Sequence, residues 1–216
     1  RTTASHNVYR GEDLDAYDVR GRVAHESIFN VADDGAYRCP NSQQGYSPFS
    51  TWTRGLAWAL LGFAEQLEFL RLTPKAEIES ALYFNGRPPK DRQLAALFKR
   101  MRKRHSIVAL TPEDTMRIYA EAATATADFY LAHACADGIP VWDTGAPHLH
   151  RLPANYLSKP ANPFNPWEPV DSSAAAIAAQ GFIRLGHYLT AHGEKSAGKK
   201  YFQAGLTIAD TLFAEP

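Results

Sequence analysis

The segment from Ser50 to Arg71 constrains the fold more than any other part of the chain. Its apolar residues recur at helical spacing and cover most sides of the helix they predict. Such a helix has to be covered by neighbours, so we expect an inner helix of an all-α protein. Ser50 or Thr51 can cap its start, which places Arg54 within the first turn or so.

Three further helices are marked by their ends. Thr111-Pro112-Glu113-Asp114 is typical of a helix start, with a threonine cap, proline at the first helical position and acidic residues in the first turn. That helix should run to about Ala134. Two more are expected at about 172–190 and 195–213, joined at His192-Gly193, and the first has an alanine-rich side suited to a close neighbour.

The remaining segments predict turns and loops. Residues 18–30 indicate a short β-hairpin that turns at Arg20-Gly21. The stretch 136–170 contains seven of the 14 prolines, so it should be an ordered, non-helical loop of the kind that lines binding clefts. Residues 73–111 are expected to be an insertion with a helix at 90–104 and no chemistry of its own.

Composition excludes several classes of protein. The 216 residues are 45% hydrophobic with no net charge, which indicates one globular unit. The longest apolar run, 55–64, is far shorter than the roughly 20 residues of a membrane span. The balanced charge argues against nucleic-acid binding, and we interpret the basic run 99–104 as a solvated helix face.

Cys39 and Cys135 are too few for a disulfide framework or a thiolate metal site. Because the sequence begins with Arg1, its lack of a signal segment leaves the compartment open.

The segment 44–58 holds the side chains best suited to an acidic sugar. A cation at a helix start, here Arg54, opposes the helix dipole unless an anion accompanies it. A guanidinium fork and free backbone N–H groups could together bind one carboxylate. Trp58 shares a helix face with Arg54, while Trp52 could form a second wall against a sugar ring, and Gln44 adds an amide. The alternative is that both indoles are core residues and Arg54 lies on the surface or stacks on one of them.

These residues resemble the unsaturated glucuronyl hydrolases, glycoside hydrolase family 88. Members of that family carry Gln-Gly-Tyr-Ser followed by Trp-x-Arg-Gly-x-Ala-Trp, as this chain does from Gln44 onwards. Two more segments resemble the family in the same order, 137–143 (Asp-Gly-x-Pro-x-Trp-Asp) and the Asp-Ser-Ser-Ala helix start at Asp171. A softer match surrounds His25. The resemblance runs from about residue 8 to the end, apart from the insertion.

Single positions depart from the family pattern. Leu56 stands where the family commonly has glutamine, and Gln43 where some members have histidine. Ala57 resembles the glucuronyl group more than its sister family, which acts on unsaturated rhamnogalacturonan and usually reads Arg-Gly-Asn-Gly-Trp at this point.

The resemblance implies an (α/α)6 barrel of six helical hairpins. The helices expected here make up roughly half of such a ring. We therefore expect residues 1–216 to be a single, C-terminal portion of a toroidal catalytic domain, with an insertion at 73–111, completed by the remainder of the same polypeptide. The family's two functional aspartates, including its general acid and base, should precede Arg1.

The resemblance also implies an activity. The expected partner is an unsaturated uronic-acid oligosaccharide left by a polysaccharide lyase, and the expected reaction is hydration of the C4=C5 vinyl ether of its terminal sugar. Arg54 would bind the carboxylate, Gln44 a hydroxyl or the carboxylate, and Trp52 and Trp58 would stack on the substrate. His25 would orient water or ring substituents, or would only tie down the hairpin. No cofactor, membrane or nucleic acid is implied.

Rival interpretations remain open. No acid in the chain is a convincing substitute for the expected aspartates: Asp143 either supports its loop or faces the cleft, and Asp171 stands where a helix cap would. His148 and His150 could begin a metal site but lack a third ligand at readable spacing, so we assign no metal. A non-catalytic sugar-binding module, or a hydrolase of saturated glycosides on the same fold, would use the same recognition residues.

Overall fold

The computed structural model describes residues 2–12, 16–77 and 111–214, and four long helices dominate this part of the chain. A short helix and a two-stranded antiparallel sheet accompany them. The prediction of an all-α protein with one small hairpin is therefore confirmed. The helices are α1 (Thr2–His6), α2 (Thr53–Leu72), α5 (Pro112–His133), α6 (Ser172–Ala191) and α7 (Lys195–Phe213).

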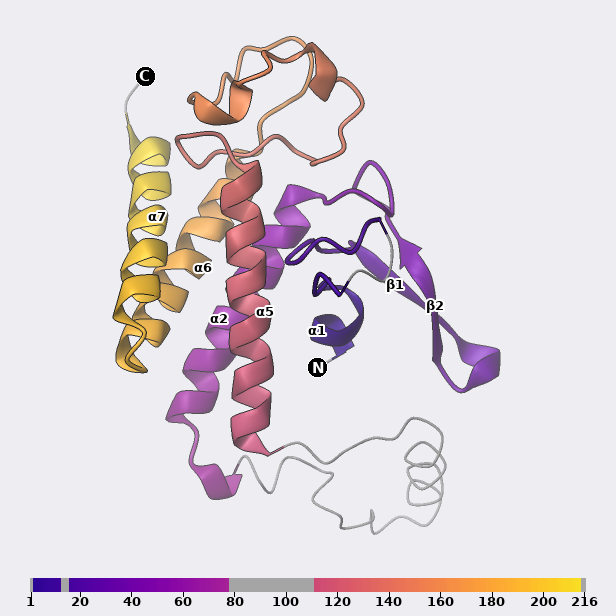
Figure 1. Cartoon of the computed structure of the whole chain (residues 1–216), viewed down its shortest axis with the longest axis vertical. Helices are drawn as coiled ribbons and strands as arrows, with labels where there is room; N and C mark the ends of the chain where they lie inside the picture. Colours follow the sequence, from indigo (N-terminus) through magenta and orange to yellow (C-terminus); the bar gives the residue numbers. More distant parts are fainter. Residues whose placement is uncertain (1, 13–15, 78–110, 215–216) are drawn as a thin grey trace.

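Helix α2 is the centre of the bundle, since it packs against both α5 and α6, while α7 packs on α6 (Figure 1). Its inward side chains Leu56, Leu60 and Leu67 are fully buried. Its other side is not covered by the described residues, because Trp58 and Phe69 are 54% and 61% exposed. The prediction of an inner helix is thus confirmed on the two sides that α5 and α6 cover. The apolar face that carries Trp58 and Phe69 is not covered by the described residues.

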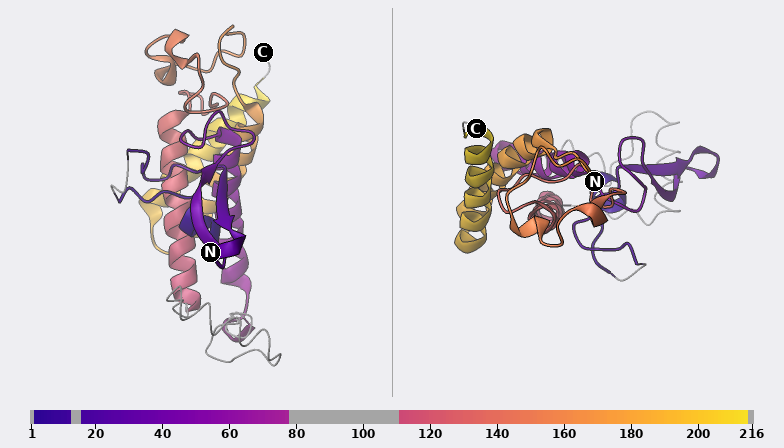
Figure 2. Two further views of the ribbon diagram at one scale, coloured as in Figure 1. Left: turned by 90° about the vertical axis from the view of Figure 1, so that its right-hand side faces the viewer. Right: turned by 90° about the horizontal axis from the view of Figure 1, so that it is seen from above.

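The connection from α5 to α6 lies across one end of the bundle (Figures 1 and 2). The starts of α2 and α6 and the end of α5 meet beneath it. The connection is ordered and holds only two short 3-10 turns, Leu149–Arg151 and Tyr156–Ser158, as its prolines predicted. Buried Glu168 organises it by accepting hydrogen bonds from the Trp142 indole and the His148 backbone N–H.

The caps of two helices show where local signals suffice and where they do not. Thr111 caps α5 as predicted, and the Asp114 side chain accepts the Thr111 backbone N–H in return, which completes a capping box. The predicted cap of α2 is wrong, because the N-cap is Trp52 and no side chain caps it. The Thr51 hydroxyl instead donates to the Val23 carbonyl at 3.2 Å, and the Ser50 hydroxyl donates to the carbonyl of Ser47.

The predicted close packing of α6 is confirmed on the side that faces α7. A Cβ atom at Gly205 of α7 would lie 2.8 Å from the carbonyl oxygen of Ala179, so the two helices approach at backbone distance beside an alanine of α6. The alanines of α6 that are buried in the core are Ala174, Ala175, Ala178 and Ala179.

The hairpin lies later in the chain than predicted. Strands β1 (Glu26–Asn30) and β2 (Ala36–Asn41) pair antiparallel, with a bulge between Ile28 and Phe29. Its turn is at Asp34-Gly35, where both residues have positive φ angles of 51° and 74°. Residues 18–30 therefore supply only one strand. The chain does turn at Gly21, but this turn does not join the two strands. The Gly21 N–H donates to the carbonyl of Tyr9 at 3.0 Å.

The predicted insertion at 73–111 lies largely outside the described residues, as does its predicted helix at 90–104. Within the part that is described, no helix combines the length and apolar character that crossing a membrane demands.

Candidate functional site

The three motifs that are separated in the sequence meet at the start of α2. Thr53 donates its backbone N–H to the carbonyl of Trp142 at 3.0 Å and its hydroxyl to the carbonyl of Val141 at 2.9 Å. Trp52 forms an isolated antiparallel bridge with Asp143. Arg54 pairs with Asp171 at the start of α6. The segments 44–58, 137–143 and 171–174 are therefore one structural unit.

His25 holds the loop that follows β2. Because Glu26 pairs with Asn41, His25 lies beside residues 42–44. Its Nδ1 accepts the backbone N–H groups of Gln43 and Gln44 at 3.2 and 3.3 Å, so the ring proton belongs on Nε2. His25 therefore does anchor the end of the hairpin, which was one of its two expected roles. A role toward a ligand is left to the Nε2 atom, which makes no hydrogen bond within the described part of the chain.

Asp143 supports the loop and does not face a cleft. Its side chain is completely buried, and it accepts the backbone N–H groups of Tyr46 at 2.9 Å and Gly145 at 2.8 Å. A second hydrogen bond between these two segments runs from the N–H of Thr51 to the Thr144 hydroxyl. With both carboxylate oxygens occupied by fixed donors, Asp143 is a structural anchor.

Arg54 is the second residue of α2, so its predicted place in the first turn is confirmed, and an anion from the protein itself accompanies it. Its Nε and Nη2 atoms lie 3.1 and 3.0 Å from Oδ2 of Asp171. The Arg54 side chain is 42% exposed and that of Asp171 is 3% exposed. Asp171 also caps α6, as predicted, because its Oδ1 accepts the N–H of Ala174 at 2.8 Å.

This pairing was not foreseen in the sequence. Arg54 and Asp171 lie 117 residues apart, and nothing local to either residue identifies the other. The available signal was the unfavourable position of a cation at a helix start, which called for an anion. The structure shows that one such anion is a side chain of the chain itself.

The aromatic residues of the predicted site have different environments. Trp52 is half-buried between two other site residues: the His25 ring centroid is 4.8 Å away, and the Arg54 guanidinium carbon lies 5.7 Å from the Trp52 ring. Trp58 lies one turn after Arg54 on α2, exposed, and is not a core residue of the described chain. Gln44 is exposed on the loop that His25 holds.

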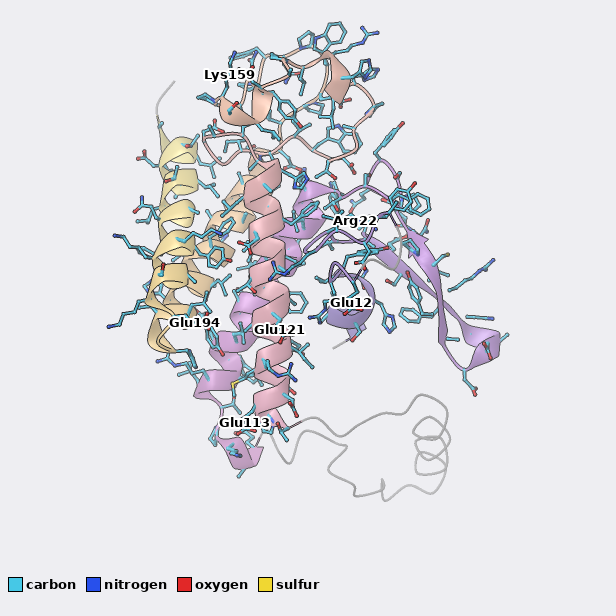
Figure 3. The ribbon with its side chains drawn as sticks, viewed as in Figure 1. Glu12, Arg22, Glu113, Glu121, Lys159 and Glu194 are labelled. Carbon is cyan, nitrogen blue, oxygen red and sulfur yellow. The ribbon has the colours of Figure 1, made fainter. Side chains whose placement is uncertain are left out.

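Arg22 is a supporting residue that the sequence did not reveal. It is only 4% exposed, and its guanidinium carbon lies 3.9 Å from the Tyr9 ring centroid (Figure 3). Its Nε donates to the carbonyl of Tyr17 at 2.6 Å, and its Nη1 donates to the carbonyl of Ser50 at 3.4 Å. The buried cation therefore fixes the turn that leads into α2.

Burial keeps Tyr130 protonated beneath the site. Its hydroxyl donates to the carbonyl of Gly138 at 3.0 Å. Burial, and then the negative charge of Asp171, raise the pKa of Tyr130 well above its usual value. Tyr130 therefore serves as a hydrogen-bond donor in the core and not as a base at neutral pH.

His148 and His150, the two histidines considered as metal ligands, make other contacts. The His148 and His150 rings are 6.4 Å apart between centroids, and His148 Nδ1 lies 3.2 Å from Glu168. Within residues 2–12, 16–77 and 111–214, no three histidine, cysteine, aspartate or glutamate side chains form a group that could hold a metal ion.

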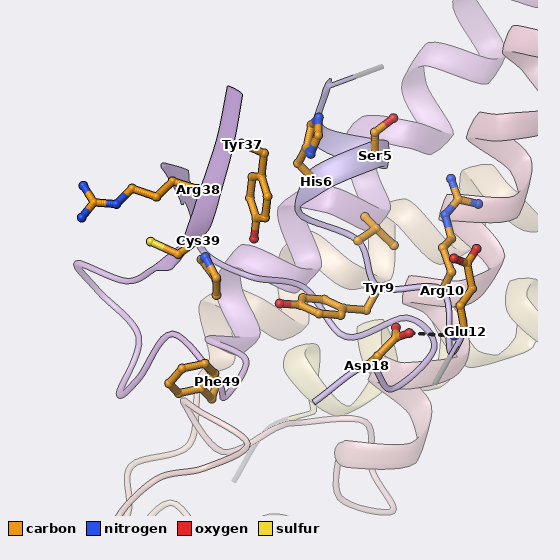
Figure 4. Close-up of a pocket in the computed structure, with 12 residues that line it drawn as sticks. Ser5, His6, Tyr9, Arg10, Glu12, Asp18, Tyr37, Arg38, Cys39 and Phe49 are labelled. Carbon is orange, nitrogen blue, oxygen red and sulfur yellow. Dashed lines mark hydrogen bonds between the residues drawn. The ribbon is translucent and has the colours of Figure 1, made fainter. Parts of the chain in front are cut away.

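Two cavities of the described chain lie away from the candidate residues. The larger, about 460 Å³, is lined by residues of α1, the following segment and β2, with the stacked rings of His6 and Tyr37 on one side (Figure 4). The smaller, about 190 Å³, lies under the α5–α6 connection beside Cys135. Neither is lined by His25, Gln44 or the start of α2.

The chain matches no protein-family model and no curated protein. Its fold is similar to a solved unsaturated glucuronyl hydrolase, responsible for the degradation of glycosaminoglycan, from Bacillus sp. GL1. The TM-score is 0.58 at 20% identity, over 98% of this chain and 37% of that chain. The same values apply to a structure of a UGL variant with dGlcA-Glc-Rha-Glc. An unsaturated glucuronyl hydrolase specific for heparin gives a TM-score of 0.53 at 19% identity, over 95% of this chain and 38% of that chain.

The chain thus spans little more than a third of the length of these neighbours. At this identity the similarity establishes the architecture and leaves the activity to be argued from the site. The chain has the fold of part of an α/α toroid, as found in the unsaturated glucuronyl hydrolases.

Proposed function

We propose that this chain is the recognition part of an unsaturated glucuronyl hydrolase of glycoside hydrolase family 88. Its substrate would be an oligosaccharide that a polysaccharide lyase has left with a 4,5-unsaturated uronic acid at its end. The ordered motifs, their convergence at the start of α2 and the shared toroidal fold support this assignment.

The observation that carries the proposal is how Asp171 binds Arg54. Asp171 occupies the edge of the guanidinium formed by Nε and Nη2. On the opposite edge, formed by Nη1 and the second N–H of Nη2, Nη1 donates no hydrogen bond to the described residues. Two parallel N–H groups remain there on a side chain that is 42% exposed. That edge matches one carboxylate, which is the group that distinguishes a uronic acid from a neutral sugar.

The neighbouring side chains fit a sugar ring attached to that carboxylate. Trp52 and Trp58 offer indole faces on either side of Arg54 in the sequence, and Trp58 is exposed. Gln44 is held near Trp52 through its backbone contact with His25. We assign Gln44 to a hydroxyl or the carboxylate, and the Nε2 proton of His25 to a ring substituent or the attacking water.

The reaction would be hydration of an alkene. A proton adds to C4 of the vinyl ether and water adds to C5, and the resulting hemiketal opens to release the next sugar. Neither buried carboxylate near the start of α2 can supply the proton, because Asp143 accepts two backbone N–H groups and Asp171 holds Arg54 and α6. We therefore place the general acid and base on aspartates in the part of the toroid that this chain does not contain. We refer to the chain together with that part as the complete polypeptide.

The test uses the complete polypeptide and an unsaturated uronyl disaccharide. Loss of the ultraviolet absorbance of the alkene measures turnover. We expect Arg54→Lys to lower kcat/KM about tenfold or more with little change in the melting temperature, since a hydrogen bond to a charged group contributes about 1.5–3 kcal/mol. Arg117→Lys, the same substitution at an exposed ion pair on α5, is the matched control and should leave kcat/KM unchanged.

Other outcomes would contradict the proposal in distinct ways. Equal losses of rate and stability in Arg54→Lys would make Arg54 structural. Binding of the disaccharide without loss of absorbance would indicate a non-catalytic sugar-binding module, an alternative favoured by the lack of a free carboxylate near Arg54 in the described residues. Cleavage of a saturated glucuronide would indicate an ordinary glycoside hydrolase on the same fold.

A further inference from the structure

We propose that Asp171 is a positioning residue that aims the free edge of the Arg54 guanidinium at the carboxylate of the substrate. The inference rests on the proposed function and adds a second residue to its recognition site. Asp171 would not touch the substrate, since its side chain is 3% exposed and both of its oxygens have partners.

Asp171 is the fixed member of the pair. Its Oδ1 accepts the N–H of Ala174 at 2.8 Å, and its own backbone N–H donates to the carbonyl of Pro140 at 2.8 Å. The N-terminal end of α6 stabilises the negative charge on its carboxylate. Arg54 reaches out from α2 on a long and half-exposed side chain, which on its own would adopt many rotamers.

The geometry of the pair determines what remains for a ligand. A carboxylate that takes Nε and Nη2 together fixes the plane of the guanidinium as well as its position. The remaining edge then points away from Asp171 within that plane. A ligand carboxylate would meet two N–H groups that are already oriented, so less conformational entropy is lost on binding.

Charge alone predicts the opposite effect of removing Asp171. The pair carries no net charge, so replacing Asp171 with a neutral residue makes the site more positive and should strengthen binding of any anion. Positioning predicts weaker binding of the uronate, because the guanidinium loses its orientation. The sign of the change therefore separates the two explanations.

A suitable variant is Asp171→Asn, because asparagine is as good a helix cap as aspartate and preserves the start of α6. Asp171→Ser is a second capping variant in case the first does not fold. Calorimetry on the complete polypeptide compares the unsaturated uronyl disaccharide with its carboxyl methyl ester, which is neutral. We expect Asp171→Asn to weaken binding of the acid about 10- to 100-fold, as expected for a misplaced binding group, and to leave binding of the ester unchanged.

A double-mutant cycle gives a readout that a purely structural role would not move. If Asp171 acts through Arg54, adding Asp171→Asn to Arg54→Lys should cause no further loss of affinity for the acid. Asp128→Asn is the matched control, since it removes another carboxylate that joins segments, through Arg20 and Lys200, without contacting Arg54 or Asp171. It should lower the melting temperature and leave the ratio of acid to ester affinity unchanged.

The outcomes distinguish this inference from the proposed function. If wild-type protein binds acid and ester equally, or binds neither, the proposed function fails and the inference with it. If Arg54→Lys removes the preference for the acid but Asp171→Asn keeps or strengthens it, only the positioning role is overturned. Additive losses in the double variant would also overturn that role.

Discussion

The carboxylate of Asp143 accepts the backbone N–H of Tyr46 at 2.9 Å across 97 residues of sequence. Through this contact the α5–α6 connection holds the loop that bears Gln44 against the start of α2. Because Asp143 is completely buried, the arrangement of the candidate site depends on a polar group that no ligand can reach.

Asp143→Ala should destabilise the protein and loosen that loop. The substitution leaves the N–H groups of Tyr46 and Gly145 without their acceptor, and a hydrogen bond to a charged group contributes about 1.5–3 kcal/mol. Urea unfolding measures the free energy, and limited proteolysis reports the loop. Asp210→Ala, at an exposed position of α7, is the control. An unchanged free energy of unfolding would show that water replaces the carboxylate without penalty.

The helices were predictable where the signals lie within a few residues of one another. Thr111, Pro112 and Asp114 mark the start of α5 completely, and the structure uses all three. The start of α2 was misplaced because Thr51 has a competing partner, the Val23 carbonyl, which is distant in sequence. Local capping preferences are weaker than a buried long-range hydrogen bond of this kind.

The hairpin was misplaced for a related reason. The sequence contains turn signals at both Gly21 and Gly35, and both residues adopt positive φ angles. Choosing between them requires knowing which strands pair. Likewise, Arg54 was identified from its unusual position at a helix start, but its partner Asp171 could be found only from the fold.

Gly21→Ala should be strongly destabilising. Gly21 has a φ of 84°, which costs other residues about 1–3 kcal/mol, and an added Cβ would lie 1.9 Å from the carbonyl oxygen of Ala125 on α5. Gly193→Ala is the matched control, because its φ is 91° but no atom lies within 4 Å of the added Cβ. Thermal melting should show a larger loss at position 21. Equal losses would mean that the segment moves away from α5 freely.

Asp128→Asn should destabilise the protein at neutral pH and not in acid. Burial opposes the charge of Asp128, but hydrogen bonds from Lys200 and Tyr201 outweigh it and lower the pKa of the carboxyl. Because the folded pKa is below the unfolded one, the stabilisation is fully present above about pH 4 and is lost as the pH falls through the folded pKa. The side chain is 38% exposed, so screening limits the effect to about 1 kcal/mol.

Melting temperatures of wild type and Asp128→Asn at pH 7 and pH 3 test this dependence. The difference should be a few degrees at pH 7, roughly 2–4 °C for each kcal/mol, and should shrink at pH 3. Asp210→Asn, an exposed residue of α7, should melt like wild type at both values. A difference that persists unchanged at pH 3 would show that packing, and not the charge, is responsible.

The two cysteines should differ sharply in reactivity toward a thiol reagent. Cys39 is exposed on β2, whereas burial and then the negative charge of Asp137 raise the pKa of Cys135 to about 11. With that pKa, about one Cys135 thiol in a thousand is ionised at pH 8, and the side chain is only 7% exposed.

In a Cys39→Ser variant, labelling of Cys135 should be slow in buffer and should accelerate in urea in step with unfolding. The reason is that the reagent gains access only when the end of α5 separates from the connection above it. A Cys135→Ser variant, which retains Cys39, should label at once. Rapid labelling of Cys135 without denaturant would mean that this connection opens in the folded protein, and the loop that anchors the start of α2 would then be far less rigid than its hydrogen bonds indicate.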